Sequence, residues 1–176
     1  LQKLLDDEDA VVALKSRERI VTGGGVGLRA LFTPGHEVDH VCYYLREDRV
    51  MFTGDTVLGA SSTSVGDLAA YMKSLELLTK FKHDTICPAH GPVVPAPRGA
   101  NLVRWQYENL MGRERQVVAA LEKGISEVSK ITSDMYPKNL KKGLRPSAER
   151  NVNTHIRKSI KEESVEETPA SFKLNN

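Results

Sequence analysis

The feature that most constrains the fold is a repeated arrangement in which three short apolar segments each lead into a loop carrying one possible metal ligand. The segments are residues 28–32, 50–53 and 85–87, and the loops lead to His36, Asp55 and His90. Each segment has the length and residue types of a β-strand, and the Gly and Pro that follow it indicate a loop. Loops at one edge of a sheet lie close together, and two imidazoles with a carboxylate suit zinc. Taken singly, each of these residues is more often a turn or supporting residue than a ligand; taken together, the three make a shared zinc site a competing interpretation, which the pattern alone does not decide.

The rest of the chain divides into a mixed first part and a helical second part. Residues 38–54 have the pattern of a β-hairpin, and the glycines at 23–27 that of a turn between strands, because no helix follows them as a dinucleotide-binding loop requires. Apolar residues at helical spacing predict a helix at 67–82. Further helices are predicted at 99–123, 126–135 and 146–162. Residues 1–19 are predicted as a polar helix or connector.

The three loop motifs, in this order and at this spacing, resemble the later motifs of the metallo-β-lactamase superfamily. The motifs are Thr33-Pro34-Gly35-His36, Thr53-Gly54-Asp55 and Pro88-Ala89-His90-Gly91. The helix that contains Tyr71-Met72-Lys73-Ser74-Leu75 is similar to the one that follows the Asp motif in the β-lactamase-like protein 2 branch, a group of endoribonucleases. Polyketide-type thioesterases are close relatives of that branch. The resemblance covers roughly residues 20–162 and is strongest up to His90.

The resemblance implies an α/β fold, the second half of an αββα sandwich with a C-terminal helical, winged-helix-like appendage. The expected domains are 1–97 for the half-sandwich, 98–162 for the appendage and 163–176 for a disordered tail. In the family His36 would complete a first zinc site, Asp55 would bridge two zinc ions and His90 would serve the second. Such a pair of ions generates hydroxide at neutral pH, and the activity implied is hydrolysis.

Three departures from the family pattern qualify this interpretation. The signature His-x-His-x-Asp-His is absent, since the histidines are at 36, 40, 83, 90 and 155 only. That motif normally lies upstream and supplies the remaining zinc ligands, so we expect this chain alone to be inactive. Glu37 stands where the family usually has Thr, and Ala60-Ser61-Ser62 replaces a stretch containing Gly and Glu.

A basic segment favours single-stranded RNA as the substrate. Residues 138–161 carry eight Lys and Arg against one Glu, which is the pattern of a phosphate-binding surface, although a solvated helix face looks the same. The predicted RNA-binding residues are Lys138, Lys141, Lys142, Arg145, Arg157 and Lys158. The alternatives are an acyl thioesterase of the same fold, which would not need these residues, and a non-enzymatic remnant or nucleic-acid-binding protein. No membrane association is expected, and a mitochondrial matrix or cytoplasmic location is expected rather than secretion.

A second zinc motif is present by sequence alone. Residues 36–40 match His-Glu-x-x-His, which binds zinc in proteases only when a helix places both imidazoles on one face. Pro34-Gly35 before it and an apolar run after it predict a loop and a strand instead. His40 is therefore expected to be a structural or supporting residue, and His83 and His155 to be surface or packing histidines. Cys42 and Cys87 are expected to be buried, reduced thiols.

Overall fold

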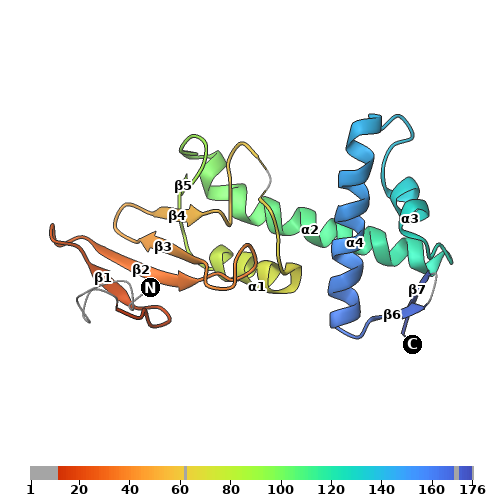
Figure 1. Ribbon diagram of the computed structural model, residues 1–176. Coiled ribbons are helices and arrows are strands. Elements are labelled where there is room, and N and C mark those ends of the chain that lie inside the picture. The colour runs from red at the N-terminus through yellow and green to blue at the C-terminus, as the bar shows by residue number, and fades with distance from the viewer. Residues whose placement is uncertain (1–11, 62, 169–170, 176) are drawn as a thin grey trace, which may run out of the picture.

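The computed structural model describes residues 12–61, 63–168 and 171–175, and its first part is a five-stranded sheet (Figure 1). The strands, in spatial order, are β1 (Arg19–Val21), β2 (Gly27–Phe32), β3 (Val41–Leu45), β4 (Val50–Gly54) and β5 (Thr85–Pro88). The predicted glycine turn joins β1 to β2, and the predicted hairpin is β3–β4. Of the expected polar helix or connector at 1–19, residues 1–11 lie outside the described residues, and residues 12–18 contain a turn and no helix.

Strand directions bring three loops to one edge of the sheet. Strands β2 and β4 are both antiparallel to β3, and β5 is parallel to β4. Strands β2, β4 and β5 therefore point the same way, and the loops that follow them leave the sheet at the same edge. These are the loops that carry His36, Asp55 and His90.

The two faces of the sheet are covered differently. Leu31, Cys42, Met51 and Ile86 on one face are fully buried beneath helices α1 (Leu68–Thr79) and α2 (Arg98–Glu122). The register places Phe52 on the opposite face, paired with Tyr43, and Phe52 is 39% exposed. Phe32 on the same face is 41% exposed. Ala30 on this face is fully buried, so among the described residues the face is open to solvent only in part, at its two phenylalanines, while the other face forms the core.

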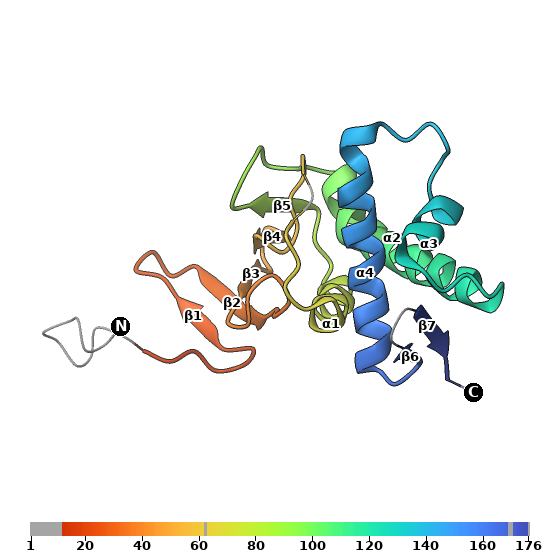
Figure 2. The same cartoon turned by 45° about the vertical axis from the view of Figure 1, so that its right-hand side comes forward.

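A second core lies at the far end of α2. Helices α3 (Val128–Met135) and α4 (Arg145–Lys161), with a short 3₁₀ helix at Lys142–Leu144 between them, pack around Val117, Ile131 and Ile156. Figure 2 shows α4 lying across α2, with the last two strands near its C-terminal end. Because α2 contributes Leu102 to the first core and Val117 to the second, the division between the cores falls inside this helix and differs from the expected boundary at 97/98.

The C-terminal tail differs from the sequence expectation. Strands β6 (Val165–Thr168) and β7 (Ser171–Leu174) form an antiparallel hairpin where residues 163–176 were expected to be disordered. Val165 is 2% exposed, and Phe172 and Leu174 pack against the second core. These alternating apolar residues supply the burial that stabilises the hairpin, although the segment is polar on average. Three helices and a hairpin agree with a winged-helix-like appendage.

Among the described residues, no helix combines the length and the apolar character that a membrane span requires. Both cysteines are free thiols, as expected, with Cys42 fully buried and Cys87 partly buried. Burial raises the pKa of Cys42 to about 11.

Candidate metal centre

The three predicted ligands meet at the carboxylate of Asp55. The Nε2 atom of His36 lies 3.8 Å from Oδ2 of Asp55, and Nε2 of His90 lies 3.4 Å from Oδ1. Each imidazole therefore faces a different oxygen of the same carboxylate. Within the described residues, no group of three or more His, Cys, Asp and Glu side chains is placed to hold one metal ion. The geometry thus offers two adjoining two-ligand positions that share Asp55.

The orientation of His36 leaves one ring nitrogen free to bind a metal. Its Nδ1 lies 2.8 Å from the carbonyl oxygen of Ser64. A carbonyl can only accept a hydrogen bond, so Nδ1 carries the proton, and in the neutral imidazole the lone pair is then on Nε2, the nitrogen that faces Asp55. Metal-binding histidines are commonly held in this way by a carbonyl or carboxylate behind the ring. His36 thus fits the ligand role.

His40 holds the backbone of Asp55. The backbone N–H of Asp55 donates to Nε2 of His40 at 3.1 Å, and Nδ1 of His40 lies 2.9 Å from Oγ1 of Thr33 and 3.1 Å from Oγ1 of Thr56. Both ring nitrogens are therefore engaged within the protein. Burial, together with the charge of His36, lowers the pKa of His40. The neutral ring is the form that accepts the Asp55 hydrogen bond.

The zinc-protease interpretation of residues 36–40 fails on geometry. These residues form turns between β2 and β3 rather than a helix. The rings of His36 and His40 are 6.1 Å apart between centroids and nearly perpendicular, and Nε2 of His40 is already occupied by the Asp55 N–H. The second histidine of the motif is a supporting residue, as the sequence favoured.

Two glycines of the motifs allow close approaches. A Cβ at Gly35 would stand 2.4 Å from Cα of Tyr71, so only glycine lets this loop pack against α1. A Cβ at Gly54 would stand 2.6 Å from Nε2 of His40, and Gly54 also has a left-handed φ of 52°. Glycine at 54 therefore permits the contact between His40 and Asp55.

Helix α1 anchors the loops that carry the ligands. The hydroxyl of Tyr71 donates to the carbonyl of Thr56, and the hydroxyl of Ser74 donates to the carbonyl of Pro34 at 2.7 Å. The two residues are one turn apart and face the sheet edge together. The sequence indicated this helix but not these hydrogen bonds. A Tyr and a Ser three residues apart on a buried helical face were the available signal.

His90 is held through the backbone of its loop. Its side chain is 75% exposed, and the N–H of Ala89 donates to the carbonyl of Gly54 at 2.9 Å. This bond ties the β5 loop to the residue before Asp55. At the start of α2, Arg98 donates to the carbonyl of Gly59 in the Asp55 loop. The backbone of this edge is thus fixed while the imidazole of His90 stays accessible.

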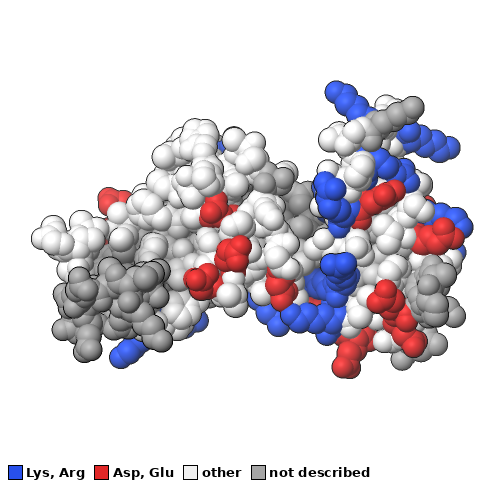
Figure 3. Space-filling view, viewed as in Figure 1, with Lys and Arg blue, Asp and Glu red and all other residues white. Residues whose placement is uncertain are grey.

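The predicted RNA-binding residues do not form one free basic surface. Lys158 contacts Glu114 and Glu162 at 2.6 Å each, with a side chain only 9% exposed, and Arg145 binds Glu149 and Ser133. Lys138, Lys141 and Arg157 are exposed, and the side chain of Lys142 lies outside the described residues. Figure 3 shows Lys and Arg along α4 interspersed with Asp and Glu. Two of the six residues are thus used in intramolecular contacts.

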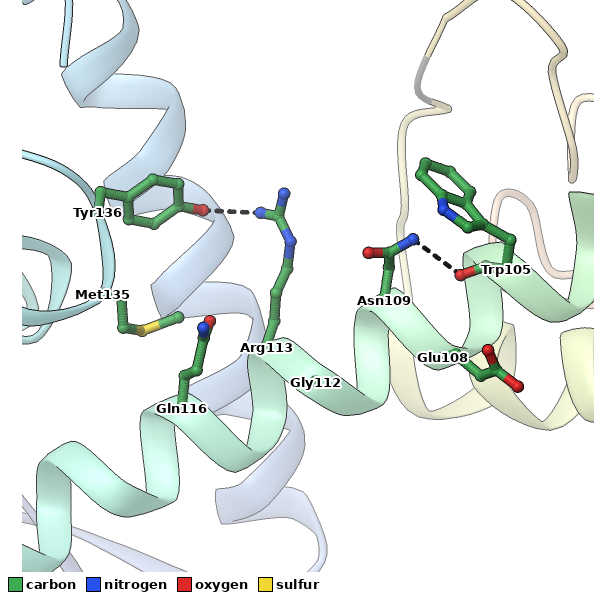
Figure 4. Close-up of a pocket in the computed structure, with 8 residues that line it drawn as sticks. All are labelled: Trp105, Glu108, Asn109, Gly112, Arg113, Gln116, Met135 and Tyr136. Atoms are coloured by element: carbon green, nitrogen blue, oxygen red, sulfur yellow. Dashed lines mark hydrogen bonds between the residues drawn. The ribbon is translucent and has the colours of Figure 1, made fainter.

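A hollow of about 420 Å³ on α2 is separate from the candidate metal centre (Figure 4). Its lining includes Trp105, Arg113 and Tyr136, and Arg113 donates to the Tyr136 hydroxyl at 2.7 Å. None of the lining residues belongs to the loops that carry His36, Asp55 and His90. The hollow is therefore not part of the candidate metal centre, whose position is set by the directions of β2, β4 and β5.

Comparison with known proteins identifies the class to which this fold and site belong. The profile of the metallo-β-lactamase superfamily matches residues 3–90, half of the chain. The chain belongs to the metallo-β-lactamase superfamily. In solved structures the fold is similar to that of a β-lactamase domain protein from Burkholderia ambifaria, with a TM-score of 0.71 and 18% identity over 95% of this chain and 53% of that one. A metallo-β-lactamase family protein from Thermus thermophilus gives a TM-score of 0.66 and 20% identity over 92% of this chain and 54% of that one.

Among curated proteins the similar relatives are fungal. An atrochrysone carboxyl ACP thioesterase of Aspergillus fumigatus is 40% identical over 61% of this chain and 35% of its own length. A thioesterase of the same name from Aspergillus chevalieri is 37% identical over 69% of this chain and 43% of its own length. The lactamase-like protein nscB of Aspergillus fumigatus is 36% identical over 68% of this chain and 34% of its own length.

These relatives correct the expected branch. The similar curated proteins named above carry thioesterase or lactamase-like names and not endoribonuclease names, so they support the thioesterase-like branch and not the endoribonuclease branch. The matched region spans half or less of each of these relatives. The superfamily itself, inferred from the three loop motifs, is confirmed.

Proposed function

We propose that this chain supplies one half of the catalytic domain of a metal-dependent thioesterase that hydrolyses an acyl thioester carried on an acyl carrier protein. The observation that carries the proposal is the Asp55 carboxylate, with His36 at one oxygen and His90 at the other. The names of the relatives from Aspergillus fumigatus and Aspergillus chevalieri support the thioester substrate. The paired state of Lys158 and Arg145 removes much of the reason for choosing RNA.

The donor set fits zinc. His36 and Asp55 would hold one ion and Asp55 and His90 a second, with further ligands expected from the upstream family motif. When bound, two such ions supply a water of lowered pKa as nucleophile and positive charge beside the developing oxyanion. His36 is oriented by Ser64, and the backbone of Asp55 by His40. Because His90 is exposed, the open side of the site lies at this residue.

The substrate class is tested with two proteins, this chain and a chimaera. The chimaera joins the segment that precedes the matched region in the Aspergillus fumigatus relative to the start of this chain. Both are loaded with zinc and assayed on an aromatic acyl thioester, by release of the thiol, and on a fluorescent single-stranded RNA. The proposal predicts thioester hydrolysis by the chimaera, loss of that hydrolysis in Asp55→Ala and no RNA cleavage.

A matched control separates catalysis from folding. Asp48→Ala removes an exposed carboxylate from the β3–β4 turn and leaves the ligand loops untouched, so hydrolysis should persist. Cleavage of RNA without thioester hydrolysis would reverse the choice of substrate. A folded, zinc-bound chimaera that attacks neither substrate would favour the non-enzymatic remnant.

A further inference from the structure

A basic pocket adjoins the candidate metal centre on the side of α4. It has a volume of about 320 Å³ and lies between residues 65–68 and one face of α4, which presents Thr154, Arg157, Lys158 and Lys161. These four positions follow the i, i+3, i+4, i+7 spacing of a single helical face. Figure 3 shows Lys and Arg where α4 meets the sheet-bearing part of the protein. The pocket thus gathers three cationic side chains from one helix.

The cations differ in how far they are neutralised. Lys158 contacts two carboxylates, and Lys161 contacts Asp67 at 2.6 Å. A lysine ammonium has three donors, so Lys161 keeps two after this contact. Arg157 is exposed and makes no hydrogen bond or ion pair with the described residues. Its guanidinium is the uncompensated charge of the pocket and the group best shaped to bind a phosphate through two donors.

The floor of the pocket touches the backbone of a candidate ligand. A Cβ at Gly66 would stand 3.1 Å from the carbonyl oxygen of His36, and the N–H of Gly66 donates to the carbonyl of Gly35 at 2.8 Å. Ser64, whose carbonyl orients the His36 ring, directly precedes the pocket residue Val65. One short loop therefore forms both the back of His36 and the wall of the pocket.

We propose that this pocket binds the phosphate of the phosphopantetheine arm that carries the acyl thioester, with Arg157 as the principal contact and Lys161 as the second. The inference rests on the thioesterase function proposed above. In an acyl carrier protein the thioester sulfur and the phosphate lie at opposite ends of one flexible arm. A phosphate held beside the His36 loop would confine the thioester to the neighbourhood of Asp55. Hydrolysis would be favoured because the reacting group is already positioned when the chemical step begins.

The test uses thiols, so that neither metal nor hydrolysis enters the result. The chain is titrated with 4′-phosphopantetheine and with pantetheine, which differ only by the phosphate, and binding is followed by calorimetry and by the amide NMR signals of residues 65–68. The phosphorylated thiol should bind at least about tenfold more tightly, as expected for a charge-assisted contact. In Arg157→Ala the ratio of the affinities for 4′-phosphopantetheine and pantetheine should fall close to one. Arg150→Ala, which removes an exposed arginine of α4 outside the pocket, should leave the ratio unchanged.

Equal affinity for the two thiols, or an unchanged ratio in Arg157→Ala, would overturn the inference. A short single-stranded RNA that binds more tightly than 4′-phosphopantetheine and depends on Arg157 would also overturn it, in favour of a nucleic-acid surface. Thioester hydrolysis by the chimaera without selective phosphate binding would support the thioesterase function and overturn the phosphate site. Selective phosphate binding without hydrolysis would remove the thioesterase function and keep the anion site.

Discussion

The backbone N–H of Asp55 donates a hydrogen bond to Nε2 of His40 at 3.1 Å. This contact reaches from the loop after β2 to the loop after β4, and it exists because Gly54 has no side chain in the way. The residue that bridges the two candidate metal positions is therefore placed by a histidine that is not itself a ligand candidate. The effect of this histidine on zinc binding can be measured without any substrate.

Replacing His40 should weaken zinc binding without removing a ligand. In His40→Ala the Asp55 N–H loses its acceptor, and the carboxylate is no longer held between His36 and His90. Loss of such a supporting residue typically costs about 10–100-fold in metal affinity. Zinc affinity of the chimaera, measured by competition with a chromophoric chelator, tests this. Glu37→Thr changes an exposed residue of the same loop and should preserve both zinc affinity and hydrolysis; a hundredfold loss of activity there would revive a general-base role for Glu37.

Lys158 should prove to be a stabilising residue of the second core. Lys158→Met leaves the carboxylate of Glu114 largely buried without its partner, and breaking such a pair costs about 3 kcal/mol in the free energy of unfolding. The double variant Lys158→Met/Glu114→Leu should recover most of that loss, because no charge remains unpaired. Chemical denaturation of the single and double variants measures the difference. Equal stability of Lys158→Met and the parent protein would mean that Lys158 is free to bind other molecules, as the RNA interpretation required.

His155 should make the stability fall in acid. Burial, with the charges of Arg113 and Lys158, lowers its pKa to about 4. In the unfolded chain His155 takes up a proton near pH 6.5, whereas in the folded protein it stays neutral until the pH approaches 4. The contribution of His155 to the free energy of unfolding is therefore complete above pH 6.5 and is lost as the pH falls toward 4. The loss is on the order of 3 kcal/mol. Denaturation between pH 7 and pH 4 should show a shallower pH dependence in His155→Gln. An identical slope in both proteins would show that folding does not shift the pKa of His155.

The open sheet face should behave as an unpaired interface. In the family fold this face packs against the other half of the sandwich, and here Phe32 and Phe52 are partly exposed on it. Phe32→Thr/Phe52→Thr should reduce self-association of the isolated chain in sedimentation experiments, while destabilising the chimaera. Val38→Thr removes an apolar side chain that is 88% exposed outside the sheet and serves as the control. We expect the double substitution to be favourable in the isolated chain, which associates less, and unfavourable in the chimaera, which becomes less stable. No effect in either protein would mean that nothing packs on this face.

The features that depend on chain direction and local pattern could be predicted from the sequence. His36, Asp55 and His90 each follow a strand, and strands that point the same way bring their loops to one edge, so their proximity could be anticipated. The role of Tyr71 and Ser74 could not, because periodicity shows which helical face is buried but not which carbonyl it meets. Charge counting failed at Lys158 for a similar reason, since one of its two carboxylate partners, Glu114, lies 44 residues away in the sequence.

The C-terminal hairpin shows another limit of pattern reading. Val165, Phe172 and Leu174 are three apolar residues in a polar segment, too few to outweigh its composition. They become stabilising only because the second core, built by α2, α3 and α4, offers a surface for them. Their burial is a property of the assembled fold and not of the segment.

The proposed metal centre requires Asp55 to be a ligand at both positions, and the zinc content of the protein measures this role. The chimaera, dialysed against metal-free buffer and analysed by atomic emission, is predicted to retain two zinc ions per molecule. The isolated chain, with two candidate ligands for each position, is predicted to retain little zinc. Asp55→Ala in the chimaera should lose most of the bound zinc, because it removes one ligand from both positions, while Asp48→Ala should retain both ions. Two zinc ions retained by Asp55→Ala would show that Asp55 does not bridge the two metal positions.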